Sequence, residues 1–154
     1  VARRILRMAV EDIGLADPEA QIHCLSAWQA YERLGSPEGE LALAAAVTYL
    51  ALAPKSNASY VSYKSARQAA KKTGSLPPPK HILNAPTDLM KDQGYGQRYD
   101  YDHDAEDGFS GQNYFPDEIE RERYFKPIER GFERDLLKRV KYFDTLRAKR
   151  NNGP

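Results

Sequence analysis

The sequence has only one cysteine, Cys24, and almost no net charge. A single thiol excludes a disulfide framework within the chain and a cysteine-based zinc site, and it is typical of proteins in the reducing cytosol. Lysine and arginine number 23 against 22 aspartates and glutamates, so the sequence lacks the large cationic excess that marks many nucleic-acid-binding proteins. The composition therefore favours a cytoplasmic protein and gives no strong signal for DNA binding.

A long hydrophobic run is also missing. In the longest one, residues 41–53, only Thr48 is clearly polar, but the run is too short for a bilayer, which requires about 20 apolar residues. No signal peptide is recognisable. The chain begins within a helical pattern and without an initiator methionine, so we expect a fragment of a longer protein with no membrane partner.

The common motifs of nucleotide-binding and hydrolytic enzymes are absent. The sequence contains no GxxxxGK[ST] phosphate loop, no GxGxxG, no GxSxG and no HExxH. One acidic cluster begins like a calcium loop, but Ala105 stands where that loop requires glycine, and Gly111 stands where it requires a bidentate glutamate. The cluster consists of Asp100, Asp102, His103, Asp104, Glu106 and Asp107. We therefore predict no metal site, no cofactor-binding residue and no catalytic residue, and we interpret the cluster as a hydrogen-bonded loop.

The stretch of residues 36–57 is the one around which the other elements are expected to assemble. Ser36 is suited to the N-cap and Pro37 to the first turn of a helix that is apolar on almost every side. Such a helix must be covered on most sides. It is predicted to be the central helix of an all-α core, or a helix shared between the core and a subunit interface.

Further helices are predicted on both sides of this central one. Their expected spans are residues 1–13, 17–35, 58–73, 86–93 and 127–150, of which 86–93 is a short helix. Trp28 is interpreted as an anchor of the core. Residues 95–126 are rich in Gly, Tyr and Asp, and their aromatic content predicts an ordered loop with one short hairpin. The expected organisation is a single domain, 1–154, with a helical core at about 1–94, an ordered loop at about 95–126 and a C-terminal helix at about 127–150.

Two sets of side chains are candidates for contacts with partners. The last helix carries an apolar stripe at a spacing of three or four residues, which must pack on the core or on another subunit. The residues of this candidate interface are Ile128, Phe132, Leu136, Val140 and Phe143. A weaker signal for contact with a DNA backbone comes from Arg3, Arg4, Arg7, Lys64, Arg67, Lys71 and Lys72.

Several long segments carry the most specific signal. They are EDIGLADP (residues 11–18), AYERLGSPEGELALAAAVTYLALAPKSN (30–57), GSLPPPKHILNAPTDLMKDQGYG (74–96), and YDHD (101–104) followed by GQNYFPD (111–117). In this order they resemble the C-terminal region of the RarA/MgsA family. These are bacterial replication-associated recombination ATPases, similar to the eukaryotic Werner-helicase-interacting ATPase and more distantly to clamp loaders.

The resemblance implies a helical oligomerisation domain that follows an AAA+ module and assembles it into a homotetramer. The full-length proteins of that family act in DNA replication, recombination and repair at stalled forks, with ATP and magnesium as cofactors. Their partners are DNA and the single-stranded-DNA-binding protein, and their location is the cytoplasm, associated with the nucleoid. None of the ATPase motifs lies in these residues, so the resemblance implies a non-catalytic fragment without a cofactor of its own.

Two alternatives of other classes remain open. One is an enzyme for a small molecule, whose site is built from the 95–117 loop, His81 and tyrosine side chains. The other is a direct DNA-binding module that uses the arginines and lysines named above. Converging carboxylates in an enclosed pocket would favour the enzyme, and a loop laid flat over helices would not.

Overall fold

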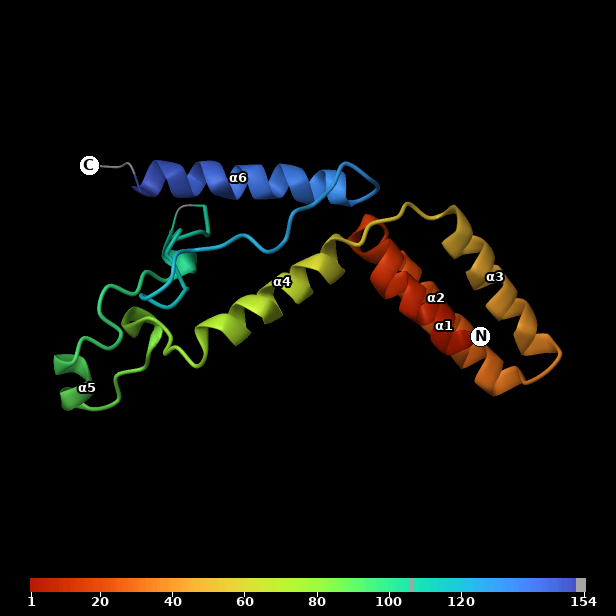
Figure 1. The fold of residues 1–154 in the computed structure, drawn as a ribbon, viewed down its shortest axis with the longest axis horizontal. Coiled ribbons are helices and arrows are strands. Elements are labelled where there is room, and N and C mark those ends of the chain that lie inside the picture. The colour runs from red at the N-terminus through yellow and green to blue at the C-terminus, as the bar shows by residue number, and fades with distance from the viewer. Residues whose placement is uncertain (106, 152–154) are drawn as a thin grey trace. The chain divides into compact units, whose positions relative to one another are not determined.

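A computed structural model describes residues 1–105 and 107–151, and their secondary structure consists of helices, turns and loops without a strand. This confirms the predicted all-α class. The α-helices are α1 (Ala2–Met8), α2 (Glu19–Leu34), α3 (Glu38–Leu52), α4 (Ala58–Thr73), α5 (Asp88–Asp92) and α6 (Glu133–Asn151) (Figure 1). No helix among the described residues is long and apolar enough to cross a membrane.

The residues group into two compact units, which we describe separately. Unit 1 consists of Val1–Gln68 and Tyr124–Arg139, and unit 2 consists of Ala69–Arg123 and Val140–Pro154. The main hydrophobic core lies in unit 1 and is formed by α1, α2, α3 and the turns between them. The expectation of a single domain across residues 1–154 stays a prediction.

The N-terminal helix buries three apolar side chains spaced four residues apart. Ile5, Ala9 and Ile13 are almost completely buried, although the helix changes from α to a π-helical turn at Ala9–Ile13. It ends where predicted, at Gly14, whose φ of +54° disfavours other residues. A Cβ at Gly14 would lie 2.9 Å from the carbonyl oxygen of Ser56, so the close approach of these segments also requires glycine.

Helices α2 and α3 pack together through small residues. The buried residues of α2 are Ala20, Cys24 and Ala27, and a Cβ on Gly39 of α3 would lie only 2.7 Å from the Cα of Tyr31. The core face of α2 therefore consists of small side chains. Ile22 and Leu25 are largely exposed instead, because two backbones that approach this closely leave no room for large side chains between them.

The prediction that α3 is covered on most sides is wrong for the described chain. One face, with Leu43, Ala46 and Leu50, is buried, whereas Leu41 is 76% and Leu52 83% exposed. The N-cap prediction is also wrong, because Ser36 caps no backbone group and donates from its hydroxyl to the Glu40 carboxylate at 2.7 Å. Helix α3 is thus a one-sided partner of α2 with an apolar outer face.

Helix α4 has the predicted bounds, Ala58–Thr73. The Ser56 hydroxyl accepts a hydrogen bond from the N–H of Ala58 at 3.2 Å, and the Ser56 N–H donates to the carbonyl of Asp12 at 2.9 Å. These bonds fix the start of α4 beside the end of the first helix. Tyr60 and Val61, which were expected to pack, are both nearly half exposed.

The last helix starts at Glu133 rather than at Pro127. Residues 127–132 form turns because their backbone groups find partners outside a helix. The Phe132 N–H donates to the carbonyl of Ala16 at 2.8 Å, and the Ile128 N–H donates to the buried carboxylate of Glu133 at 2.8 Å. Gly131 between them has φ +49°, which is incompatible with a right-handed helix.

Unit 2 is built around the C-terminal half of α6. A 3-10 turn at Lys80–Ile82 follows the proline run. Thr87 is the N-cap of α5, and its hydroxyl accepts a hydrogen bond from the N–H of Met90. In the described part of the 95–126 loop the predicted hairpin is absent, and the local structure consists of turns and a 3-10 helix at Asp102–Asp104. The loop lies against α6, with the rings of Phe109 and Phe143 centred 5.0 Å apart.

Candidate functional site

The outer face of α3 is the most apolar exposed surface of unit 1. Leu41, Ala45, Thr48 and Leu52 follow each other at spacings of four, three and four residues, so they form one stripe. All four are exposed, and the stripe lies opposite the buried face with Leu43, Ala46 and Leu50. Spacings of this kind are typical of helices that pack along each other.

Two open grooves flank the contact between α2 and α3. One has a volume of about 460 Å³ and is lined largely by alanines of both helices, with His23 and Tyr49 at its side. The other, of about 570 Å³, is lined by Trp28 and Tyr31 of α2, Val47 of α3 and the start of α1. Trp28 is only half-buried there, so its interpretation as a core anchor is wrong.

The candidate interface residues of α6 do not form one free surface. Ile128, Leu136 and Val140 are half-buried, and Phe132 and Phe143 are 37% and 41% exposed. Phe132 lies under the Arg139 guanidinium, and Phe143 contacts Phe109 within unit 2. The proposed role of these five residues in a subunit interface stays a prediction.

The basic residues of α1 are exposed, and one of them is neutralised locally. Arg3 and Arg4 form no ion pair with any described residue, whereas Arg7 binds the Glu11 carboxylate at 2.9 Å. The hydrogen bond and charge of Glu11 raise the pKa of Arg7, and Tyr60 of α4 lies near enough to contribute in the same direction. Arg7 and the start of α4 are therefore neighbours in unit 1.

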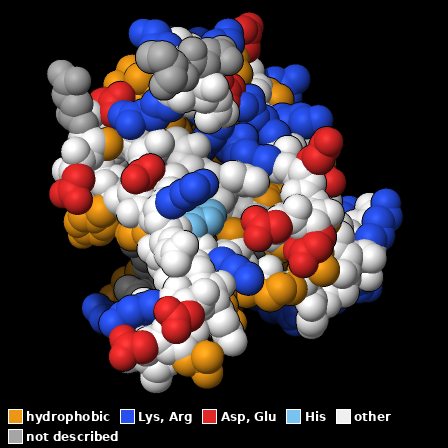
Figure 2. Space-filling model, turned by 90° about the vertical axis from the view of Figure 1, so that its left-hand side faces the viewer, with side chains coloured by type: hydrophobic (Ala, Val, Ile, Leu, Met, Phe, Trp, Pro, Cys, Tyr) orange, Lys and Arg blue, Asp and Glu red, His pale blue; other side chains and the backbone are white. Residues whose placement is uncertain are grey.

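Helix α4 carries cations without a single acidic residue. Helical periodicity places Tyr60, Lys64, Arg67 and Lys71 along one stripe, opposite the inner side with Ala58. The stripe is exposed, and its three cations form no ion pair with the described residues. Lys72 is exposed beside it. Elsewhere the charges are mixed, and Figure 2 shows a face on which basic and acidic side chains are interspersed.

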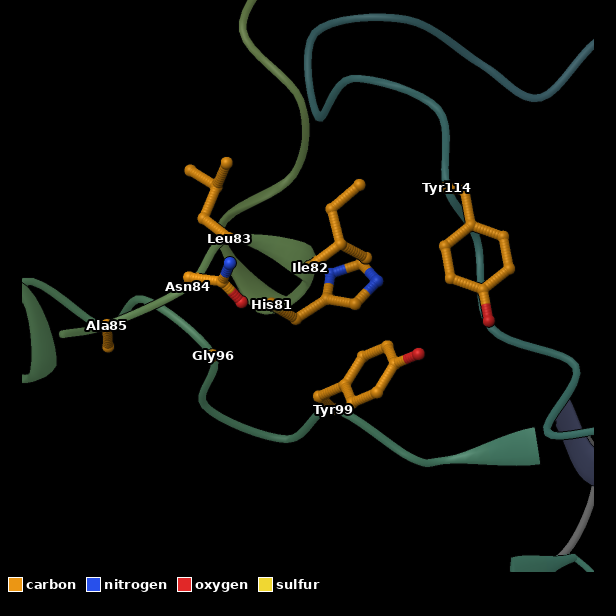
Figure 3. Close-up of a pocket in the computed structure, with 8 residues that line it drawn as sticks. All are labelled: His81, Ile82, Leu83, Asn84, Ala85, Gly96, Tyr99 and Tyr114. Atoms are coloured by element: carbon orange, nitrogen blue, oxygen red, sulfur yellow. The ribbon is translucent and has the colours of Figure 1, made fainter. Parts of the chain in front are cut away.

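Unit 2 contains an aromatic pocket of about 500 Å³. In Figure 3 the imidazole of His81 lies between the rings of Tyr99 and Tyr114, which come from different parts of the 95–126 loop. The centroids of His81 and Tyr114 are 6.1 Å apart. The remaining lining residues are Ile82, Leu83, Asn84, Ala85 and Gly96. The Nε2 atom of His81 is buried and forms no hydrogen bond with the described residues.

Three arginines, Arg123, Arg121 and Arg147, form a cluster near Asp144 of α6 and lower the pKa of its carboxyl group. Arg123 binds Asp144 of α6, and Arg147 lies with its guanidinium 5.0 Å from the ring centre of Phe109. Burial and the charges of Arg121 and Arg123 lower the pKa of Arg147, whereas Asp144 and Tyr114 raise it. The Nε of Arg147 is buried without a hydrogen bond to the described residues.

The acidic loop does not gather its carboxylates around a metal. The N–H of Ser110 donates to Asp102 at 2.7 Å, and the hydrogen bonds of Ser110 lower the pKa of this carboxyl group. Asp107 pairs with Arg150. Glu106 lies outside the described residues. Among those described, no group of three or more histidine, cysteine, aspartate or glutamate side chains is arranged to hold a metal ion.

Sequence reasoning found part of these sites and missed others. It named α4 and, as part of an enzyme alternative, His81 with loop tyrosines. It missed Arg121, Arg123 and Arg147, because the first two lie in the loop and the third on α6, and the alternating charges of residues 120–123 resemble an ordinary solvated segment. It also missed the outer stripe of α3, because an apolar helix gives no sequence signal for which of its faces is exposed.

Comparison with known proteins identifies the class. Residues 1–144 match the family model described as "MgsA AAA+ ATPase C terminal". The chain thus belongs to the family of C-terminal domains of MgsA-type AAA+ ATPases, as the resemblance of its segments indicated. It is therefore a C-terminal part of such an ATPase.

Relatives with curated names extend this result. The chain is 50% identical over 147 residues to a "Replication-associated recombination protein A" of Coxiella burnetii, covering 95% of this chain and 33% of the relative. It is 48% identical over 134 residues to the protein of the same name in Escherichia coli K12, covering 86% and 30%. It is 42% identical over 127 residues to the "ATPase WRNIP1" of Dictyostelium discoideum, covering 82% and 14%. The chain therefore spans about a third or less of these relatives.

Proposed function

We propose that this chain is a non-catalytic assembly module that brings copies of an AAA+ ATPase together, with a homotetramer as the final state. The outer stripe of α3 is the observation that carries the proposal. Leu41 and Leu52 are more than three quarters exposed in a helix that is otherwise almost entirely apolar. A contiguous apolar surface of this kind on a soluble domain marks an interaction site.

A second copy of the chain is the partner that this surface fits best. Its outer stripe has the four-three-four spacing of self-associating helices and carries no charge that would repel an identical stripe. The alanine groove beside it gives a neighbouring helix room for close approach. Each large apolar side chain fully buried stabilises the contact by about 1.5–3 kcal/mol, so a few of them recurring in a symmetric assembly can offset the cost of association.

The test is light scattering of the purified chain over a concentration series. We expect the mass to rise towards four copies, and we expect Leu41→Glu to give a smaller mass at unchanged helicity. Leu89→Glu is the matched control, because Leu89 is a 67% exposed leucine on α5. A chain that stays monomeric up to about millimolar concentration, where an interaction of about 4 kcal/mol becomes visible, would sink the proposal, as would an equal effect of the two substitutions.

The whole protein's role is proposed from the names of its relatives. Several of them are called replication-associated recombination proteins, and a role in replication and recombination is proposed for the longer chain. In that setting the module would hold the AAA+ modules together at stalled or damaged forks, close to DNA and the single-stranded-DNA-binding protein, in the cytoplasm with the nucleoid. ATP and magnesium would bind the AAA+ part.

A second candidate function, direct contact with DNA, is favoured by α4. Its stripe with Tyr60, Lys64, Arg67 and Lys71 is cationic, exposed and free of acidic neighbours on the same helix. Such a stripe suits a phosphate backbone and would bind without sequence preference. Lys64→Glu with Arg67→Glu should then abolish binding of a labelled DNA duplex at low salt. Equal binding of DNA by the unmodified chain and the variant would exclude this face of α4 as the DNA-binding surface.

A further inference from the structure

The pocket of unit 2 combines two features that a nucleotide requires. It has aromatic rings of His81, Tyr99 and Tyr114 around an open volume of about 500 Å³, and the loop that carries Tyr114 contacts Arg147 of α6 through Phe109. We propose that unit 2 holds one nucleotide of a single-stranded nucleic acid, with the base in the pocket and the phosphate at Arg121 and Arg147. This does not depend on self-association and concerns residues other than those of α4.

The shape and chemistry of the pocket favour a base over an aliphatic side chain. Its lining mixes ring faces with polar groups, namely the Asn84 amide and the Tyr99 and Tyr114 hydroxyls (Figure 3). A nucleobase is flat, stacks on aromatic rings and requires hydrogen bonds at its edge. Asn84 is exposed, so its amide is accessible to a ligand at the mouth of the pocket.

The buried Nε2 of His81 gives the pocket a group in need of a partner. Buried polar atoms of folded proteins are normally hydrogen-bonded, and an exception requires an explanation. The Nε2 atom has no hydrogen-bond partner within the described chain. A base edge, or a water molecule held by the ligand, would supply one. The site would thereby gain a hydrogen bond that the free protein lacks.

The arginine cluster supplies the counterpart for the phosphate. Arg123 is already paired with Asp144, whereas Arg121 and Arg147 form no ion pair with a described residue. Arg147 is held by its contact with Phe109, so its guanidinium is positioned before a ligand arrives. Guanidinium groups bind phosphate oxygens with charge-assisted hydrogen bonds.

The test uses the 154-residue chain and a fluorescently labelled oligothymidylate, with binding followed by anisotropy as salt is raised. Tyr99→Ala should weaken binding about tenfold, because stacking of one base has roughly that effect. Arg121→Ala should reduce the slope of log affinity against log salt by about 0.7, the value for one phosphate contact on a single strand. Tyr142→Ala and Arg33→Ala are matched controls at exposed positions outside the site and should leave binding unchanged.

A second measurement does not depend on variants. The chain has three histidines, so their imidazole C–H signals can be followed by NMR while the oligonucleotide is added. The signal of His81 should shift with saturation, whereas the signal of His23, which stacks on Tyr49 in unit 1, should not. Absence of a His81 shift at saturating oligonucleotide would overturn the proposal.

Three other results would also overturn it. Equal losses in Tyr99→Ala and Tyr142→Ala would show that the pocket has no special role. Loss of binding in Arg67→Ala with full binding in Tyr99→Ala would assign the DNA contact to α4 instead. Polyglutamate that binds as tightly as the oligonucleotide, with the same sensitivity to Tyr99→Ala, would identify an acidic peptide as the ligand.

Discussion

Gly131 is the residue at which unit 1 has least room for a side chain. A Cβ at this position would lie 2.0 Å from the carbonyl oxygen of Ala16 and 2.7 Å from the ring of Pro54. The same carbonyl accepts a hydrogen bond from the next residue, Phe132, so it cannot move away freely. This glycine lets the segment before α6 lie directly on the turn between α1 and α2.

We expect Gly131→Ala to lower the free energy of unfolding by about 3 kcal/mol or more, because a forced backbone shift adds to the conformational cost. Urea denaturation measures the change. Gly35→Ala is the control, because Gly35 has φ +69° but no atom within 4 Å of its added Cβ. It should lose only the conformational part, about 1–2 kcal/mol. Equal losses of stability in the two variants would contradict the close approach of Gly131 to the Ala16 carbonyl.

Tyr49 links α3 to the start of α2. Its hydroxyl donates to the Asp17 carboxylate at 2.8 Å, while the other carboxylate oxygen accepts from the N–H of Glu19 at 3.2 Å. Asp17 therefore has the capping role that its position indicated, and it also binds the neighbouring helix. The hydrogen bond to Asp17, followed by burial and the charge of Asp17, raises the pKa of Tyr49.

The raised pKa predicts a loss of stability at alkaline pH. The native state keeps the phenol proton after the unfolded chain has released it, so this contribution is complete below about pH 10, the usual phenol pKa, and falls as pH rises through the higher native value. Tyr49→Phe should lower stability by about 1 kcal/mol near neutral pH. Its unfolding free energy should then decline less steeply above about pH 10 than that of the unmodified chain. Parallel pH profiles of the two proteins would refute this assignment.

At the scale of elements, the packing of α2 on α3 depends on small side chains. Ala20, Cys24 and Ala27 of α2 meet the face of α3 with Leu43 and Ala46. Interiors are packed at nearly constant density, so a larger residue at such a contact separates the helices. A substitution that increases side-chain volume at this contact should therefore destabilise unit 1.

Ala46→Leu should destabilise unit 1 by about 1–3 kcal/mol through overpacking. Ala51→Leu makes the same change on an exposed position of the same helix and should change stability by less than about 0.5 kcal/mol. Thermal unfolding followed by circular dichroism distinguishes them. A larger effect at the exposed site would mean that α3 is oriented differently.

The helical elements illustrate how far the sequence alone leads. The bounds of α4 and the end of the first helix at Gly14 were predictable because they depend on local capping and glycine conformations. The start of α6 was not, because the Phe132 N–H binds the carbonyl of Ala16, which is far away in the sequence. Distant partners of this kind leave no local signal.

At the scale of the whole molecule, family membership identifies the chain as a C-terminal part of an AAA+ ATPase. It matches a C-terminal domain family over residues 1–144, and it contains no phosphate loop. The chemistry of phosphoryl transfer requires a backbone cradle for the phosphates and carboxylates for magnesium. The sequence contains no such phosphate loop, and we predict that ATP turnover by the longer protein depends on residues outside this chain.

We therefore expect the purified chain to release no phosphate from ATP with magnesium beyond the buffer blank. A coupled phosphate assay at high protein concentration provides the measurement. The informative control is a preparation carried through a second column, since a contaminating ATPase separates from the protein while an intrinsic one does not. Turnover that follows the protein and disappears on substitution of Asp102 or His81 would instead support the enzyme alternative.

The sequence by itself determined the all-α class, most helix bounds and the family, because these depend on periodicity, capping and long ordered segments. Tertiary structure decided which faces are covered. Leu41 and Leu52 look like core residues in the sequence, but α2 covers only the opposite side of their helix. Likewise Tyr99, Tyr114 and Arg147 become neighbours of one site only through the path of the loop on α6. Burial and proximity depend on which distant segments of the chain approach each other, and the local sequence pattern does not contain that information.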